Sequence, residues 1–318
     1  MNGANGQRPR PVPDPAGWRL LAFADELAEP VTGLSLASRP LVAVRDQGRI
    51  RVFDGTCPHR GAHLGYGGCL TDGPAIICPF HGKWVGLGDQ AEPGGAGSLS
   101  VREHDVIDGG GAIFVRLADV PARDHGFARA IAGILPTHEV IGAVTGQVRV
   151  PPELIIENAF DFAHFPTVHL ISRLARPEVR LGEDGELSIM TSFRTKAPAW
   201  ETAEGDFTSR FHARAFNPGL VVTELGPDGS SNFVFTAATA AQGGCLARIA
   251  VAVRRPAADG TAAALIEGAR LAFEQDLLVW NHLDLSAPVC LDSRDTPVLA
   301  FRAFCASFAA APAGAGVR

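Results

Sequence analysis

Two short motifs of cysteine and histidine constrain this chain more than any other part of its sequence. The motif CPH (57–59) follows one predicted strand and the motif CPFH (78–81) follows another, with 18 residues between them. Zinc fingers usually take both cysteines from one knuckle and both histidines from a helix, whereas each loop here supplies one of each. The pattern favours a [2Fe–2S] cluster with two cysteines on one iron and two histidines on the other, and a zinc site is the alternative. The candidate ligands are Cys57, His59, Cys78 and His81.

The residues around these ligands suit a cluster. Gly61 and Gly82 allow tight loops that bring backbone N–H groups near sulfur. His63 lies off the ligand positions, and we expect it to pack or to form hydrogen bonds. The other cysteines show no pairing pattern, so we expect each to be a small buried apolar residue. They are Cys69, Cys245, Cys290 and Cys305.

The segments CPHRGAHL (57–64) and CPFHGKW (78–84) resemble the Rieske iron–sulfur domain in the order and spacing of their ligands. The resemblance implies a [2Fe–2S] cluster on the four residues named above. Neutral imidazoles in place of two thiolates make such a cluster less negative and raise its reduction potential. The second segment departs from the H-G-W pattern common in the family, because Lys83 stands between Gly82 and Trp84.

Length and charge limit what the rest of the chain can be. A chain of 318 residues is expected to form about two domains. A net charge of −6 argues against a nucleic-acid-binding surface, which would be basic. The sequence holds no run of about 18 apolar residues, so we expect no membrane span. No apolar stretch follows the arginines near the start, so we expect no secretory signal and a cytoplasmic protein.

Turn residues between alternating apolar runs predict an α+β fold with an all-β module first and a sheet-plus-helix domain second. The runs at 41–45 and 49–53 flank a Gly-containing turn and predict a hairpin. The glycines at 109–111 precede a strand instead of following one, so they form no dinucleotide-binding fingerprint. Further strands are expected at 75–80, 112–117, 147–150, 187–193, 207–216, 220–226, 231–240 and 245–255. The expected parts are a flexible tail (1–17), a cluster domain (18–120), a second domain (121–308) and a flexible C-terminus (309–318).

A second pair of histidines, His164 and His169, lies in a segment whose apolar spacing predicts a helix over 157–169, at least up to Pro166. On a regular helix, residues five positions apart point about 140° away from each other. We expect Pro166 to break the helix between the histidines and to turn His169 toward a shared centre. The polar residues that recur every three positions in this segment are Asn158, Asp161 and His164.

Helical periodicity selects a carboxylate to join these histidines. A non-heme Fe(II) centre uses two histidines and one carboxylate and leaves other positions open for O₂ or water. The longest helical pattern spans 261–283, and Asp276 falls in the middle of its apolar stripe, where a carboxylate needs a cation. Glu267 and Glu274 fall on the opposite, solvated face. The stripe contains Leu265, Ala269, Ala272, Val279, Trp280 and Leu283.

The segments ENAFDFAHFPTVH (157–169) and QDLLVWNH (275–282) extend the resemblance to the catalytic α-subunits of Rieske non-heme iron oxygenases. The resemblance implies that the second domain is a helix-grip catalytic domain. It implies that the mononuclear iron is held by His164, His169 and Asp276, with Asn158 near it. It also implies that Asp161 links this iron, through hydrogen bonds, to a cluster histidine of the neighbouring subunit. The segment 295–308 is weakly similar to the group that contains the 3-ketosteroid 9α-hydroxylases and cholesterol desaturases.

The same resemblance implies the reaction and the partners. The cluster passes single electrons to the iron, which uses O₂ to oxidise a bound substrate by hydroxylation, dihydroxylation, desaturation, demethylation or ring formation. A separate reductase with flavin and NAD(P)H, with or without a ferredoxin, supplies the electrons. A homotrimer follows from the family, because the two metals of one subunit are typically too far apart for fast electron transfer.

Few charged residues lie in the expected strands of the second domain, so we expect an apolar substrate, polycyclic or a secondary metabolite. The residues expected to line its cavity are Phe193, Phe211, Phe216, Val222, Phe233 and Phe235. Two other classes of protein stay open at this point. One is a Rieske-type electron carrier, which needs only about the first hundred residues. The other is a zinc-bound structural or ligand-binding protein.

Overall fold

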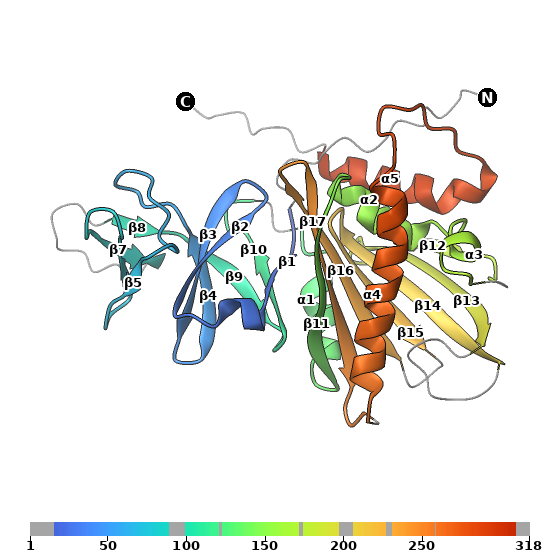
Figure 1. Ribbon diagram of the computed structural model, residues 1–318, viewed down its shortest axis with the longest axis horizontal. Coiled ribbons are helices and arrows are strands. Elements are labelled where there is room, and N and C mark those ends of the chain that lie inside the picture. The colour runs from blue at the N-terminus through green and yellow to red at the C-terminus, as the bar shows by residue number, and fades with distance from the viewer. Residues whose placement is uncertain are drawn as a thin grey trace. The chain divides into compact units, whose positions relative to one another are not determined.

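The computed structural model describes residues 16–88, 99–120, 123–171, 174–196, 206–226, 231–257 and 259–309. The chain divides into two compact units, one of residues 17–123 and one that contains the residues from 124 onward (Figure 1). Most of the tail expected over 1–17, and all of the C-terminus beyond residue 309, lie outside the described residues.

The first unit contains a six-stranded sheet, in the order β1-β10-β9-β4-β3-β2, and a four-stranded sheet, in the order β5-β6-β7-β8. Both sheets are antiparallel except for the pair β7–β8. The elements are β1 (Arg19–Phe23), the 3-10 helix η1 (Ala24–Leu27), β2 (Val31–Leu36), β3 (Arg39–Asp46), β4 (Arg49–Asp54), β5 (Cys69–Leu70), β6 (Ala75–Ile77), β7 (Trp84–Leu87), β8 (Leu99–Val101), β9 (Glu103–Asp108) and β10 (Ala112–Arg116).

The predicted hairpin is confirmed as β3 and β4, which meet at the pair Asp46–Arg49. Alternate residues of these strands point to opposite sides of the sheet, and both sides are buried. Leu41 and Ala43 pack into one hydrophobic core, whereas Val42 and Val44 pack into another that also contains Cys57 and Cys78. One face of the hairpin therefore shares a hydrophobic core with the two cysteine loops.

The second unit is built on a seven-stranded antiparallel sheet in the order β11-β17-β16-β15-β14-β13-β12. Its strands are β11 (His138–Val148), β12 (Glu178–Leu181), β13 (Leu187–Lys196), β14 (Asp206–Asn217), β15 (Leu220–Gly226), β16 (Asn232–Ala241) and β17 (Gly244–Arg254). Its helices are α1 (Phe127–Ile134), α2 (Pro152–Glu157), η3 (Asn158–Phe160), α3 (Phe165–Val168), α4 (Thr261–Trp280), η4 (Ser293–Asp295) and α5 (Thr296–Ala309).

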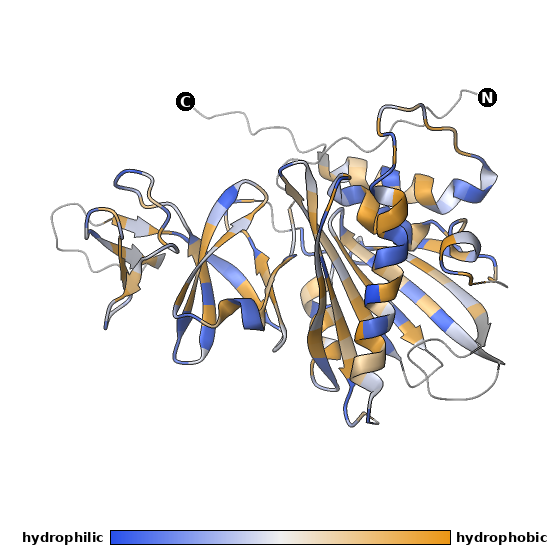
Figure 2. Ribbon diagram, in the orientation of Figure 1, coloured by the Kyte–Doolittle hydropathy of each residue, from blue (hydrophilic) through white to orange (hydrophobic). Residues whose placement is uncertain are grey.

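Helices cover both faces of this sheet. The long helix α4 lies across the face that is in front in Figure 1, and α1 lies behind the sheet. A Cβ atom on Gly146 of β11 would lie 3.0 Å from two ring carbons of Phe273 on α4, so any other residue here would require this ring to shift. On the other face, the rings of Phe127 and Phe216 meet at a centroid distance of 5.3 Å. Hydrophobic and hydrophilic residues alternate along α4 in Figure 2, as expected for a helix with one face on the sheet. In the described part of the chain, no helix is both long and apolar enough to cross a membrane.

Two expectations for the second unit are wrong in extent. The strand expected at 147–150 begins much earlier, at His138, because β11 pairs with β17 along its whole length and this pairing carries Gly142 and Gly146 into the sheet. The helix expected over 157–169 is broken. Asp161 is extended, with φ −99° and ψ 93°, and its Oδ1 accepts the N–H of Ala163 at 2.9 Å. This local hydrogen bond competes with the helix and ends it.

Candidate metal centres and active-site cavity

The two Cys–His loops fold in the same way. In each loop the cysteine N–H donates to the carbonyl five residues later, Ala62 or Lys83, at 2.8 Å. In each, the N–H of the glycine four residues after the cysteine donates back to the cysteine carbonyl. These glycines, Gly61 and Gly82, have φ of 76° and 63°, a conformation that other residues rarely adopt. Lys83 is therefore part of the second turn through its backbone.

The loops separate sulfur from nitrogen. Cys57 and Cys78 are each 1% exposed, and their thiols are hydrogen-bonded to each other. The rings of His59 and His81 are exposed and lie 4.8 Å apart between centroids. In the described chain, these four side chains do not bring three ligand atoms within 4.8 Å of one another. Buried sulfurs at one end and exposed imidazoles at the other suit a cluster of two irons better than a single zinc ion.

Backbone dipoles act on the buried sulfurs. Burial alone would raise the pKa of Cys78, but the N–H groups of Phe80 and His81 and the thiol of Cys57 hold it below its ordinary value. Burial raises the pKa of Cys57. The expectation that these loops aim N–H groups at sulfur is met, and such groups stabilise a thiolate ligand.

The expectations for His63 and for the four cysteines outside the loops are confirmed only in part. His63 forms hydrogen bonds, as expected, with the Leu34 carbonyl at 3.3 Å and the Gly65 N–H at 3.1 Å. Cys245 and Cys305 are buried, and burial raises the pKa of Cys245 to about 12. The expectation of burial is wrong for Cys69, in a two-residue strand, and for Cys290, in the irregular segment after α4, which are exposed.

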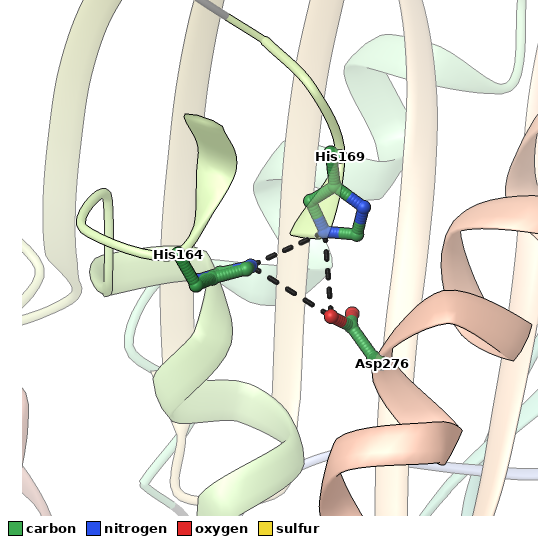
Figure 3. A group of neighbouring side chains, drawn as sticks. All are labelled: His164, His169 and Asp276. Carbon is green, nitrogen blue, oxygen red and sulfur yellow. Dashed lines mark hydrogen bonds and ion pairs between the residues drawn. The ribbon is translucent and has the colours of Figure 1, made fainter. Parts of the chain in front are cut away.

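Three side chains from distant parts of the chain converge in the second unit (Figure 3). His164 Nε2 lies 3.2 Å from His169 Nε2, and Asp276 Oδ1 lies 3.3 Å from His169 Nε2 and 3.8 Å from His164 Nε2. Each side chain is 13% exposed. Among the described residues, this is the one group of three such side chains whose ligand atoms all lie within 4.8 Å of one another.

The two histidines flank the short helix α3, His164 as its N-cap and His169 as its C-cap. Pro166 lies in the first turn, where proline is tolerated, so the expected break between the histidines is wrong. Because both histidines lie at caps rather than inside a helix, the 140° divergence of a regular helix does not apply. Asp276 comes from the C-terminal half of α4, and its side chain is mostly buried, as its place in the predicted apolar stripe requires.

Both histidines have a partner on the ring nitrogen that points away from the centre. His164 Nδ1 lies 3.5 Å from Asp161 Oδ2, and His169 Nδ1 lies 2.9 Å from Gln275 Oε1. Burial by itself would lower the pKa of His169, but Asp276 and Gln275 raise it. Burial alone would raise the pKa of Asp161, but the neighbouring His164 imidazole and the backbone N–H groups of Ala163 and His164 lower it.

This donor set fits an iron ion. Two imidazoles and one carboxylate on one side of a centre are the ligands of non-heme Fe(II) oxygenases. The three ligand atoms are 3.2 Å, 3.3 Å and 3.8 Å apart, close enough for one metal ion to contact all of them. Partners on the outer ring nitrogens, as found here, are typical of metal-bound histidines.

A cavity of about 380 Å³ opens beside these three side chains and lies between the sheet and α4. Asn158, Gln275 and the three converging side chains are part of its lining. The sheet contributes Phe193, Phe211, Val221, Thr223, Leu225, Val234, Thr236 and Ile249. Helix α4 contributes Leu265, Gly268, Ala269, Leu271, Ala272, Phe273 and Trp280. The arrangement can hold a largely apolar molecule next to a metal centre.

The expected lining is met only in part. Phe193 and Phe211 line the cavity, but Phe216, Val222, Phe233 and Phe235 do not. The reason is strand register: the cavity faces the odd-numbered residues of β15 and the even-numbered residues of β16, so Val222, Phe233 and Phe235 point to the opposite face. Phe216 of β14 also lies on that opposite face, where it packs against Phe127 of α1. The cavity side of β15 and β16 is instead formed by Val221, Thr223, Leu225, Val234 and Thr236.

The faces of α4 are mostly as expected. Glu267 and Glu274 are exposed, and Arg270 forms ion pairs with both. The predicted apolar stripe is wrong for two residues, which are exposed. Val279, in the last turn of α4, is 47% exposed, and Leu283, beyond the end of the helix, is 41% exposed. Sequence reasoning missed Gln275, Thr223 and Thr236. For Gln275 the one available signal is its position next to Asp276, and the threonines carry no signal without the strand register.

Two family models match the chain over both units. The Rieske [2Fe-2S] domain matches residues 17–89, and the 3-ketosteroid 9alpha-hydroxylase C-terminal domain matches residues 127–308, which is more than half of the chain. The chain belongs to the Rieske oxygenases with a 3-ketosteroid 9α-hydroxylase C-terminal domain. As a Rieske oxygenase it uses a [2Fe–2S] cluster, non-heme iron and O₂.

Curated relatives of this Rieske oxygenase include cholesterol 7-desaturase nvd of Bombyx mori, 28% identical over 322 residues that cover 92% of the chain and 69% of the relative. They also include a probable 3-ketosteroid-9-alpha-monooxygenase, oxygenase component, of Rhodococcus rhodochrous, 23% identical over 90% of the chain and 77% of the relative. The fold is similar to that of dicamba monooxygenase in a crystal structure with 3,6-dichlorosalicylic acid. That similarity has a TM-score of 0.71 and 20% identity over 92% of this chain and 96% of that one.

Proposed function

We propose that this chain is the terminal oxygenase of a Rieske system that oxidises a neutral, largely apolar and polycyclic substrate. The cluster is held by Cys57, His59, Cys78 and His81, and the mononuclear iron by His164, His169 and Asp276. Iron at that site supplies the O₂-dependent oxidation chemistry. The observation that carries the proposal is the mostly apolar cavity of about 380 Å³ that ends at the two histidines and one carboxylate.

The charge of the cavity wall supports a neutral substrate. No lysine or arginine is present among the described lining residues, so a substrate carboxylate away from the metal site would be buried without a basic side chain to pair with. The relatives named for cholesterol and for a 3-ketosteroid act on molecules of a matching kind. Those two names also cover desaturation and hydroxylation, which are the two outcomes that we propose here.

Two threonines add a polar point to the apolar wall. Thr223 pairs with Val234, and Thr236 pairs with Val221, so the threonines are diagonal neighbours on β15 and β16. Neither hydroxyl has a hydrogen-bond partner among the described residues, although Thr223 is only 6% exposed. Hydroxyls that face a cavity without a protein partner favour a ligand that supplies one. A carbonyl or hydroxyl group on the substrate fits this role.

Electrons from the cluster reach the iron site through Asp161 and the outer ring nitrogen of His164, Nδ1. Asp161 lies 3.5 Å from His164 Nδ1 and its side chain is 32% exposed, so it can also accept a hydrogen bond from a histidine of another subunit. The exposed rings next to the cluster loops are Tyr66, Phe80 and Trp84, each more than half exposed. Exposed aromatic residues are typical of protein interfaces. They support a homotrimer in which the cluster end of one subunit faces Asp161 of the next.

The electrons come from a separate protein. The Rhodococcus rhodochrous relative is named as an oxygenase component, which supports a reductase with flavin and NAD(P)H as partner, with or without a ferredoxin. An electron carrier without oxygenase activity has no use for the second unit and its cavity, and nothing described favours that function or a zinc-bound structural role.

A single-turnover experiment tests the proposal. The protein with both metals is chemically reduced, freed of reductant, and given O₂ with either a neutral ketosteroid or an aromatic carboxylate, and products are identified by mass spectrometry. We expect a hydroxylated or desaturated steroid, no product from the carboxylate, and no product from Asp276→Ala. Oxidation of the carboxylate with the steroid left intact contradicts the proposed substrate class.

A further inference from the structure

The side chain of Gln275 holds the outer edge of the His169 ring. Its Oε1 lies 2.9 Å from His169 Nδ1, and an amide oxygen accepts hydrogen bonds but cannot donate them. The proton of the neutral imidazole therefore lies on Nδ1. The lone pair is left on Nε2, which faces His164 Nε2 at 3.2 Å and Asp276 Oδ1 at 3.3 Å.

One turn of α4 holds this ring from two sides. Gln275 and Asp276 are adjacent in the chain, so their side chains leave the helix about 100° apart. Asp276 faces the Nε2 edge of His169 and Gln275 faces the Nδ1 edge. His169 itself lies at the end of the four-residue helix α3. The ring orientation therefore depends on the twenty-residue helix α4 more than on its own short helix.

The two histidines have different support. The outer nitrogen of His164 faces the carboxylate of Asp161, to which the proposed function gives a task in electron transfer. The outer nitrogen of His169 faces a neutral amide in the cavity wall. A neutral acceptor fixes the tautomer without adding a negative charge to the centre. The different partners give the two ligands different roles.

We propose that Gln275 is a positioning residue that fixes His169 as the Nδ1–H tautomer and thereby sets the affinity of the mononuclear metal site. This inference rests on the proposed function, because it takes His169 as a metal ligand. Loss of such an outer partner typically lowers metal affinity by about 10–100-fold. An acceptor oxygen of any charge at this place restores it.

Cobalt binding to the full chain tests the inference without turnover. The mononuclear site is emptied with a chelator under argon, the cluster is kept, and Co(II) is titrated by its d–d absorption. We expect Gln275→Leu, which removes the acceptor at similar size, to weaken Co(II) binding by about 10–100-fold. We expect Gln275→Glu, which keeps an acceptor oxygen, to bind within a few-fold of the unchanged protein. Glu274→Gln, one position along on the exposed face, is the matched control and is expected to change nothing.

Each outcome decides a separate point. Unchanged Co(II) affinity in Gln275→Leu overturns the positioning role, and so does a loss in Gln275→Glu as large as in Gln275→Leu, which would indicate packing alone. Co(II) binding in the unchanged protein should be lost in Asp276→Ala. If the unchanged protein binds no Co(II), or if Asp276→Ala binds it equally well, the proposed iron site is itself wrong and this inference is wrong with it. Cluster absorption in every variant reports whether the fold is kept.

Discussion

The Nε2 atoms of His164 and His169 lie 3.2 Å apart, although five positions on a regular helix would turn these side chains about 140° from each other. They meet because each lies at one cap of α3, where the backbone enters or leaves the helix. Asp276 of α4 closes the group from the other side of the cavity. Two imidazole nitrogens and a carboxylate held this close, and mostly buried, need a cation between them.

Replacing Asp161 by asparagine should slow electron delivery while both metals stay bound. The change removes the charge that faces His164 Nδ1 but keeps the shape of the side chain. The measurement is the rate of cluster oxidation in a single turnover with O₂ and substrate, with iron content and cluster absorption as checks. A rate equal to that of the unchanged protein removes the bridging role.

Alanine in place of Gly61 or Gly82 should impair the cluster. Both glycines have positive φ, and nothing lies within 4 Å of an added Cβ, so the cost is backbone strain of about 1–2 kcal/mol. Gly110 has φ of 83° and equally open surroundings in the β9–β10 turn, so Gly110→Ala is a matched control. We expect similar losses of stability in all three variants but loss of cluster absorption only in the first two. Equal cluster content in the three would show that the loop geometry is not needed for the cluster.

Valine at Thr223 or Thr236 should weaken binding of an oxygen-bearing substrate. The replacement keeps the shape and removes a hydroxyl that has no described partner in the protein. One lost hydrogen bond of about 0.5–1.5 kcal/mol corresponds to a rise in KM of roughly 2–10-fold with little change in kcat. Steady-state kinetics with a ketosteroid check this. A fall in kcat with unchanged KM would place the hydroxyls in the chemical step instead.

Glu224 should make the second unit more stable at neutral than at acidic pH. The imidazole of His212, whose Nδ1 lies 3.8 Å from Oε2, and hydrogen bonds from Ser231 and Arg210 lower its pKa, against some desolvation, from 4.5 to about 2. A carboxyl whose pKa is lower in the folded state contributes stability above its unfolded pKa, and this contribution is lost as pH falls from about 4.5 toward 2.

Glu224→Gln should therefore lower the free energy of unfolding by about 1–2 kcal/mol at pH 7, after allowance for solvent screening, and by much less near pH 2. Denaturant unfolding at several pH values measures the difference. The matched control is Glu139→Gln, which makes the same replacement at an exposed glutamate on β11. A difference that is the same at pH 7 and pH 2 contradicts the assignment.

Local chemistry made much of the site predictable from sequence. The Cys–His spacing indicates the cluster loops without any tertiary information, and a 3.6-residue period places Asp276 on the buried face of α4. The periodicity of apolar residues did not predict that the helix expected over 157–169 is interrupted at Asp161. There a side-chain hydrogen bond to the Ala163 N–H, only two residues away, outweighs the apolar spacing of a longer helix.

The cavity wall was harder to predict, because it depends on which face of each strand is turned inward. Phe233 and Phe235 are as apolar as Val234, yet only Val234 lines the cavity. Both faces of the sheet are covered by helices, so both faces read as apolar in sequence and alternation does not separate them. The pairing of β15 with β16 decides the side, and it is known only from the structure.

Iron content and the EPR spectrum of the nitric oxide complex, compared between Asp276→Ala and Glu274→Ala, test the central claim most directly. Two residues apart on α4, one carboxylate faces the histidines and the other faces solvent. We expect Asp276→Ala to lose the mononuclear iron, its nitric oxide signal and oxygenation by more than about 100-fold while the cluster spectrum survives, and Glu274→Ala to keep them all. Mononuclear iron retained in Asp276→Ala, or lost in Glu274→Ala, would contradict the proposed iron site.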